Sequence, residues 1–287
     1  MATASPVDLL PAARGSSRRR RSRGSPRQLT RASALGLGVA LLWFSLLVLI
    51  PLAAVIATAA AGGIAGFWDV LTNDMTAAAL RLTIGMAVLT TLVNVVMGTV
   101  IAWVLVRDRF WGRTILNVLI DIPFALPTVV AGLVLLALYG PGSPLGVNVA
   151  NTRVAVYLAL AFVTLPFVVR TVQPVLEELE GDVEEAAASL GAGRLTTFRR
   201  VILPSLVPAI TAGAALAFAR AISEYGSLVL LSGSLPFETQ VASVRVLAYL
   251  EGGDRAGAAA VATVLLVVAL AVIVFLDVLQ RRVAQRG

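Results

Sequence analysis

The sequence predicts an all-α membrane protein with six transmembrane helices and both chain ends in the cytoplasm. Hydrophobic residues make up 58% of the 287 positions and charged residues only 14%. A soluble domain has about 25% charged residues, so this chain has too few charges to cover a globule in water. The mean hydropathy of +0.90 agrees, and six apolar stretches are each about as long as a helix that crosses a bilayer.

These six stretches define the predicted spans in chain order. A hydrocarbon core of about 30 Å needs about 20 apolar residues in a helix. The spans are predicted at residues 34–58, 82–106, 115–139, 154–171, 206–231 and 257–276. The first is longer than the apolar core of a cleavable signal peptide, about 7 to 15 residues, and five more follow, so we expect it to remain as an anchor.

The later spans differ in how regular they are. The third contains Pro123 and Pro127, the fourth Pro166, and the fifth the charged residues Arg220 and Glu224. The sixth is the most regular, since no charged residue occurs from position 258 to position 276.

The arginines set the predicted orientation, because basic residues are retained on the cytoplasmic side of membrane spans. Eight precede the first span, three lie between the second and third, four lie at or between the fourth and fifth, and three follow the sixth. The alternate loops together hold four. Both termini are therefore expected in the cytoplasm.

The predicted organisation is one membrane domain, residues 34–282, with a cytoplasmic tail at each end. Residues 1–33 are rich in Arg, Ser, Gly and Pro and are expected to be disordered; residues 283–287 form the short C-terminal end. The arginine run at 18–21 also fits a nucleic-acid patch. An arginine cluster directly before a first span already has a topological use, so no nucleic-acid partner is expected.

Missing residue types exclude much common chemistry. The chain has no cysteine and no histidine, and all 23 basic residues are arginine. Without lysine there is no phosphate-binding loop ending in Gly-Lys-Ser/Thr, and without histidine or cysteine the common zinc, haem and thiolate sites are absent. We expect no metal, no bound cofactor and no catalytic residue.

One large cytoplasmic segment, residues 172–205, separates the fourth and fifth spans. Its residues 184–190 read EEAAASL, which are good helix formers with acids at the helix start. Gly191 suits a left-handed C-cap. Ala187 and Leu190 share one apolar face with Val183.

A second helix is predicted over residues 195–203, ending at Pro204 because proline cannot continue a regular helix. Two interpretations of the whole segment compete. A helix resting on the membrane surface carries Lys or Arg on its polar face and bulky apolar residues on the other, whereas this one carries acids and alanines. Small residues allow close approach, so docking to a cytoplasmic protein is favoured.

Three stretches carry a family resemblance. Glu185-Ala186-Ala187 is followed after three residues by Gly191 and after nine more by Val201-Ile202-Leu203-Pro204. This spacing resembles the EAA loop of the membrane subunits of binding-protein-dependent ABC importers, with Val201 where isoleucine is more usual. Residues 220–226 (RAISEYG) and 122–132 (IPFALPTVVAG) resemble sulfate/thiosulfate permease subunits of the CysT type and, less closely, molybdate permeases. The resemblance covers residues 35–282.

The resemblance implies the type I ABC importer permease fold, in which the EAA loop supplies a coupling helix that fits a groove on a separate ATPase subunit. The implied function is the permease subunit of an ATP-driven sulfate/thiosulfate importer in a bacterial plasma membrane. The implied partners are a second permease subunit of the CysW type, two copies of the ATPase subunit, which use the ATP, and an extracytoplasmic binding protein. The expected ATPase-coupling residues are Glu184, Glu185, Ala186, Ala187, Leu190, Gly191, Leu203 and Pro204.

Charges within the spans need their own explanation, because ionisable residues at bilayer depth are costly. Arg220 and Glu224 are four residues apart and so lie on one helix face, in the outer half of the fifth span. They either neutralise each other as an ion pair or serve the passage of an anion. Asp121, at the cytoplasmic end of the third span, is expected to snorkel or to pair with Arg113.

Pro123 and Pro127 free backbone carbonyls in a buried helix. They bend the span, and the resemblance places this region on the substrate pathway together with Arg220 and Glu224.

Two alternatives stay open: a molybdate or tungstate permease, and a stand-alone ion-coupled anion carrier or channel. A dianion entering a cell that is negative inside meets roughly 4.6 kcal/mol of opposition at 100 mV. With no nucleotide-binding motif in the chain, a separate ATPase is the economical source of that energy.

Overall fold

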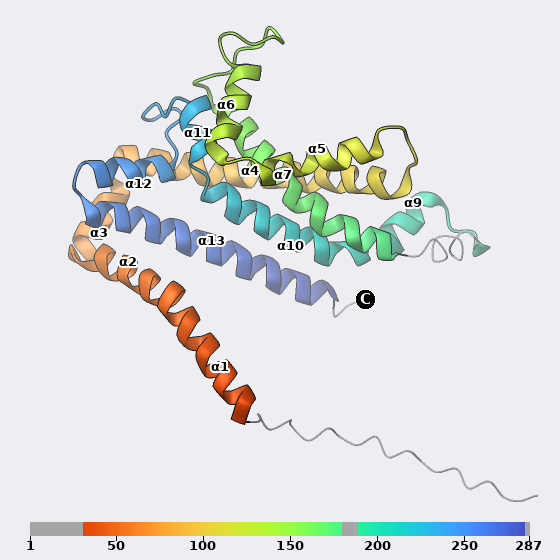
Figure 1. Cartoon of the computed structure of the whole chain (residues 1–287), viewed down its shortest axis with the longest axis horizontal. Coiled ribbons are helices and arrows are strands. Elements are labelled where there is room, and N and C mark those ends of the chain that lie inside the picture. The colour runs from red at the N-terminus through yellow and green to blue at the C-terminus, as the bar shows by residue number, and fades with distance from the viewer. Residues whose placement is uncertain (1–30, 180–186, 188, 285–287) are drawn as a thin grey trace, which may run out of the picture. The chain divides into compact units, whose positions relative to one another are not determined.

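The computed structural model describes residues 31–179, 187 and 189–284, and all regular structure within them is helical (Figure 1). The chain divides into two compact units, residues 1–50 and 51–287. In the first unit, α1 (Arg31–Phe44) continues into the π-helix η1 (Ser45–Leu49). Helix α1 therefore begins within the last three residues of the predicted tail, and residues 1–30 lie outside the described part.

The remaining helices begin at the boundary between the units and continue to residue 284. They are α2 (Ile50–Ala60), α3 (Gly63–Thr72), α4 (Asp74–Arg107), α5 (Arg113–Ala125), α6 (Thr128–Tyr139), α7 (Arg153–Glu178), α9 (Arg194–Thr197), the π-helix η2 (Phe198–Ile202), α10 (Leu203–Ile222), α11 (Gly226–Leu231), α12 (Ala242–Glu251) and α13 (Arg255–Ala284).

Five helical stretches in the described residues are long and apolar enough to cross a membrane. Four of them contain the predicted first, second, fourth and sixth spans. The five stretches are Ser33–Ala60, Asp74–Arg107, Arg153–Glu178, Arg194–Ile222 and Arg255–Arg282. The stretch Arg194–Ile222 contains most of the predicted fifth span. The number of six crossings and the orientation stay predictions.

Two of the predicted spans are interrupted in the structure. The third is divided into α5 and α6 at Leu126 and Pro127. Proline drives the residue before it out of the helical region, and Leu126 accordingly has φ −88° and ψ 134°. The fifth is divided into α10 and α11 by residues 223–225.

Two of the long helices, α4 and α7, begin with side-chain caps. The Thr76 amide donates to Asn73 Oδ1 at 3.3 Å at the start of α4, and the Ala155 amide donates to Thr152 Oγ1 at 3.3 Å at the start of α7. Such caps satisfy amides that have no partner inside the helix. At 34 residues α4 is about 51 Å long, so it extends beyond a hydrocarbon layer.

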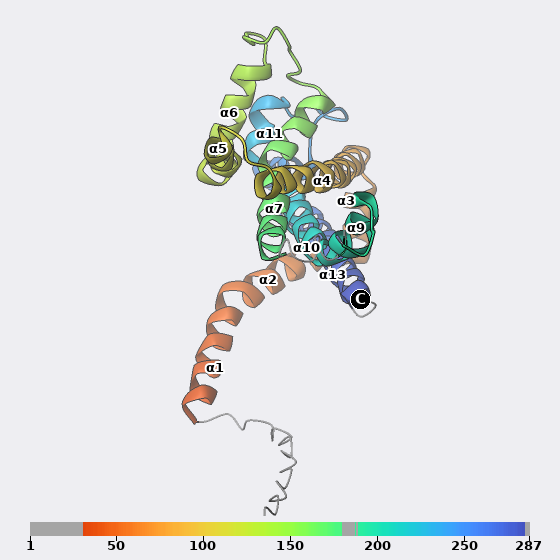
Figure 2. The same cartoon turned by 90° about the vertical axis from the view of Figure 1, so that its right-hand side faces the viewer.

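Helices α4, α7, α10 and α13 lie side by side (Figures 1 and 2). Glycines allow α7 to approach both neighbours closely: a Cβ atom on Gly98 of α4 would lie 2.9 Å from Val168 Cβ, and one on Gly213 of α10 would lie 3.0 Å from Val168 Cα. Small residues at helix contacts are typical of membrane bundles, where close backbone packing replaces the hydrophobic effect.

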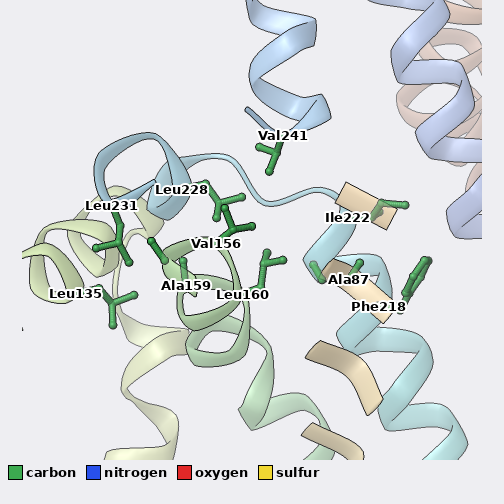
Figure 3. Packing of buried hydrophobic residues seen from close by; sticks show 12 residues of the cluster. Ala87, Leu135, Val156, Ala159, Leu160, Phe218, Ile222, Leu228, Leu231 and Val241 are labelled. Atoms are coloured by element: carbon green, nitrogen blue, oxygen red, sulfur yellow. The ribbon is translucent and has the colours of Figure 1, made fainter. Parts of the chain in front are cut away.

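The two larger buried apolar clusters hold the helices of the bundle together. Figure 3 shows the first, where side chains of α7, α10 and α11 meet Leu135 of α6. The second lies nearer the segment between α7 and α10 and includes Leu105, Leu176 and Leu206, each fully buried. The two ends of that segment are therefore anchored in the core.

We expect Gly98→Ala to destabilise the bundle by about 1–3 kcal/mol, because the added methyl group meets Val168 in a packed contact. Gly85→Ala, on the same helix with nothing within 4 Å of its Cβ position, is the matched control and should be neutral or slightly stabilising. Thermal unfolding of the two detergent-solubilised variants measures the difference. Equal midpoints would show that the α4–α7 contact is not tight.

Candidate functional site

The break between α10 and α11 is built around Glu224. This carboxylate is 1% exposed, and its Oε1 accepts from the Ser227 amide at 2.9 Å and from Ser227 Oγ at 2.8 Å. Ser243 Oγ donates to the Glu224 carbonyl at 2.6 Å. The side chain and backbone of Glu224 thus replace the hydrogen bonds that a continuous helix would have made.

Arg220 supplies the opposite charge. Its Nη2 lies 2.6 Å from Glu224 Oε2, and the Arg220 side chain is 29% exposed. The predicted pairing at i,i+4 is confirmed, but Glu224 is not a helical residue, because α10 ends at Ile222. The carboxylate also binds Ser227, a residue that sequence reasoning missed. The sequence signal for Ser227 is its position three residues after an acid that is predicted to lie within a membrane span.

The break between α5 and α6 lies against the same place. Pro127 stands directly before α6, while Pro123 lies inside α5. Helices α6 and α11 pack side by side (Figure 1). A Cβ on Gly132 would lie 2.9 Å from the Ser227 carbonyl oxygen, and one on Gly226 would lie 2.9 Å from the Val129 amide nitrogen. The two interruptions, 97 positions apart when Pro127 and Glu224 are compared, are therefore neighbours.

Interrupted helices packed at their breaks are where many transporters bind solutes, because backbone groups leave the helix there. Here the cation is the partly exposed Arg220, held on one side by the buried Glu224. This arrangement suits an anion that approaches the free side of the guanidinium. Among the described residues no group of three acidic, histidine or cysteine side chains is placed to hold a metal ion.

The predicted coupling segment begins and ends as extensions of the spans, since α7 runs to Glu178 and helical structure resumes at Arg194. Of the predicted coupling residues, Glu184, Glu185 and Ala186 lie outside the described part of the chain. Ala187 and Ser189 are helical.

A helix C-terminus follows directly. The Ala192 amide donates to the Ala187 carbonyl at 3.0 Å, and Gly191 has φ +80°. This is the Schellman arrangement that ends many helices, so the predicted left-handed C-cap is confirmed. Leu190, one residue before it, is 89% exposed. The exposed leucine thus lies beside a turn of defined conformation.

The predicted end of the second helix at Pro204 is wrong. Leu203 and Pro204 open α10, and Arg194–Ile222 is helical throughout. The π-helix η2 explains it: the Leu203 amide donates to the Phe198 carbonyl, five residues back. A proline in an α-helix collides with the carbonyl four residues before it, and the wider turn removes that collision.

Sequence reasoning also missed how this segment is held. Arg107, the last residue of α4, donates from Nη2 to the Leu179 carbonyl at 3.2 Å, beyond the end of α7. Its guanidinium stacks over Trp103 at 5.9 Å, and the Trp103 ring meets the Phe198 ring edge to face at 5.6 Å. The end of α4 therefore holds both the entry and the exit of the segment.

Asp121 pairs with Arg170 rather than with Arg113. Arg170 Nε and Nη2 each donate to one carboxylate oxygen at 2.7 Å. Arg170 also donates to Asn117 and Gln173. A forked guanidinium on α7 satisfies both carboxylate oxygens, whereas Arg113 is two helical turns away on the same helix as Asp121. This pair ties α5 to α7.

Comparison with known proteins places these features in a context. The family model for the binding-protein-dependent transport system inner membrane component matches residues 94–286. The sulfate transport system permease protein CysT of Salmonella typhimurium is 41% identical over 269 residues, which is 91% of this chain and 97% of that protein. The protein of the same name from Synechocystis is 44% identical over 250 residues, 85% of this chain and 87% of that protein.

Solved structures give the fold. A chain from a bacterial ABC transporter involved in the import of the acidic polysaccharide alginate matches with a TM-score of 0.72 at 18% identity, over 87% of this chain and 94% of that chain. A chain of the MetNI methionine ABC transporter, in an inward-facing conformation, matches with a TM-score of 0.58 at 18% identity, over 73% of this chain and 96% of that chain.

We expect the exchange Arg220→Glu with Glu224→Arg to lower stability by about 3–5 kcal/mol rather than restore it. An arginine at position 224 cannot accept the hydrogen bonds from Ser227, and a buried charge without its partners is costly. The same exchange at Asp277 and Arg281, an i,i+4 pair that is far more exposed, should change stability by under about 1 kcal/mol. Thermal unfolding of both exchanged variants measures these changes. An exchange at 220 and 224 that leaves the stability equal to that of the unmodified chain would mean that the two residues form a plain ion pair.

Proposed function

We propose that this chain, which belongs to the family of binding-protein-dependent transport system inner membrane components, is the permease subunit of an ATP-driven importer of sulfate. The observation that carries the proposal is the 41% identity to a sulfate transport system permease over 97% of that protein's length. As a transport subunit of the plasma membrane the chain is not itself an enzyme. Thiosulfate, which like sulfate is a tetrahedral dianion, is proposed as a second substrate.

The energy has to come from a partner. At 100 mV a dianion meets roughly 4.6 kcal/mol of opposition on entry, and the chain contains no phosphate-binding loop of its own. We assign ATP hydrolysis to two copies of a separate ATPase subunit and substrate delivery to an extracytoplasmic binding protein. A second permease subunit of the CysW type completes the pathway.

Docking to the ATPase is assigned to the segment between α7 and α10. The fixed turn at Gly191 presents the exposed Leu190 beside the helical residue Ala187. Glu184, Glu185 and Ala186 are proposed to lie on the same docking surface. Leu203 and Pro204 belong to the continuous helix that leads away from it, so they transmit movement rather than contact the ATPase.

The substrate pathway is assigned to the neighbouring helix breaks. Arg220 is the cation that meets the anion, and Glu224 holds its guanidinium in place. Pro127 keeps the α5–α6 interruption open, and Pro123 weakens α5 one turn before it. Support comes from the contact between α6 and α11, which keeps both breaks together.

Reconstitution into liposomes tests the function. We expect labelled sulfate uptake only when this chain is present with the second permease subunit, the ATPase, ATP and the binding protein. Omitting any one of these is the control. Uptake by this chain alone would identify a stand-alone carrier or channel, and uptake of molybdate in preference to sulfate would identify a molybdate permease.

We expect Gly191→Val to reduce transport and substrate-stimulated ATP hydrolysis severalfold while the complex still assembles. Nothing lies within 4 Å of the Cβ position, so the cost, about 1–2 kcal/mol, arises from the backbone at φ +80°. Gly191→Asn is the matched control, because asparagine tolerates this conformation. It should retain most of the activity. If both variants behave alike, the turn conformation is not what coupling requires.

A further inference from the structure

A groove of about 420 Å³ runs along residues 78–89 in the N-terminal half of α4, beside the first residue of α7. Arg81 and Arg153 contribute to its walls together with Gly85, Leu89 and Phe237. Arg81 is 26 residues before Arg107 on one continuous helix, a distance of about 39 Å. The groove therefore lies toward the opposite end of the bundle from the predicted coupling segment that Arg107 holds.

Neither arginine charge in this groove is neutralised within the described part of the chain. Arg81 makes no hydrogen bond or ion pair there, and Arg153 donates from Nε to the Glu238 carbonyl at 3.3 Å, which is a neutral acceptor. The ion pairs among the described residues join other arginines to acids. Two cations thus line one concave surface, and no acidic side chain in the described part of the chain forms an ion pair with either.

The position of Arg153 adds to this positive potential. It is the first residue of α7, whose 26 residues place the positive end of the helix dipole at the groove. A basic side chain is disfavoured at that position, where acids are the stabilising choice. An anion in the groove would interact favourably with the two guanidinium groups and with the helix end.

The groove is also lined by Phe237, an aromatic residue with an unusual backbone conformation. Phe237 has φ +63°, which bulky residues seldom adopt, and the residue is 55% exposed. The loop is held in this shape by Thr239, whose Oγ1 donates to the Ser232 carbonyl at 2.6 Å and accepts from the Leu235 amide at 2.9 Å. Backbone strain of this kind is concentrated at functional sites. The ring covers one side of the groove with apolar surface, which strengthens electrostatic attraction beside it.

We propose that this groove binds a tetrahedral oxyanion between Arg81 and Arg153, against Phe237. Arg153 holds the loop through the Glu238 carbonyl and lines the groove at the same time, so an anion bound there also acts on the loop. The identity of the free anion as sulfate rests on the proposed function. The phosphate of an anionic lipid headgroup has the same chemistry and is the second possible source.

Direct binding to the assembled complex tests the proposal. The complex with its partner subunits is placed in nanodiscs of neutral phosphatidylcholine, without the binding protein, and the dissociation constant for labelled sulfate is measured by equilibrium dialysis. We expect Arg81→Gln to raise it about tenfold, the loss of one charge-assisted interaction, and Arg81→Lys to raise it less. Because Arg81 is exposed and makes no bond to the described chain, these variants should assemble normally.

Arg255→Gln is the matched control, since it removes an exposed charge by the same substitution outside this groove. It should leave the dissociation constant unchanged. Nanodiscs containing phosphatidylglycerol separate the two sources: competition with sulfate that disappears in Arg81→Gln assigns the groove to the lipid phosphate.

Two results would overturn the proposal. One is an unchanged sulfate constant in Arg81→Gln together with no Arg81-dependent lipid competition. The other is unchanged anion binding combined with weakened docking of the binding protein, which would make the groove a protein contact. Either result leaves sulfate uptake by the unmodified complex intact, whereas failure of the proposed function would abolish that uptake regardless of Arg81.

Discussion

A buried carboxylate closes the interruption between α10 and α11, and the arrangement of the membrane domain depends on it. Backbone amides in hydrocarbon need partners inside the protein, and Glu224 Oε1 provides one for the Ser227 amide. Helix α6, which begins directly after the interruption at Leu126 and Pro127, packs against Ser227 through Gly132. The two helix interruptions pack against each other, so backbone groups that would be costly to leave unpaired in hydrocarbon are buried within the protein.

Polar contacts also link this site to the predicted coupling segment between α7 and α10. Helix α7 contacts α4 and α10 along its length, and the Asp121–Arg170 pair fastens the broken α5 to it. At its far end the Leu179 carbonyl is held by Arg107. The segment is therefore linked to α4 and α7, and through α7 to α5, by polar contacts of defined geometry.

Local patterns in the sequence were sufficient for much of this. Apolar length gave the long helices, and the Gly191 turn followed from a glycine after a helix-forming run. The ion pair of Arg220 with Glu224 followed from their spacing. The partner of Asp121 did not, because Arg170 is 49 positions away and sequence offered Arg113 nearby. Pro204 misled for a related reason: its effect depends on whether the preceding turn is α or π, which hydrogen bonds decide. The contact of the two breaks depends on tertiary packing, and no periodicity encodes it.

The unbroken helix from Arg194 to Ile222 joins the predicted coupling segment to the edge of the Glu224 site over 29 residues. Such a rod fixes angle as well as distance: one residue more or fewer would swing the carboxylate about 100° around the axis and shift it about 1.5 Å. The π-turn before Pro204 already contains one such angular offset, built in permanently. The number of residues between η2 and Glu224 therefore sets the direction in which the carboxylate points. Substitutions along this helix should be tolerated far better than insertions or deletions in it.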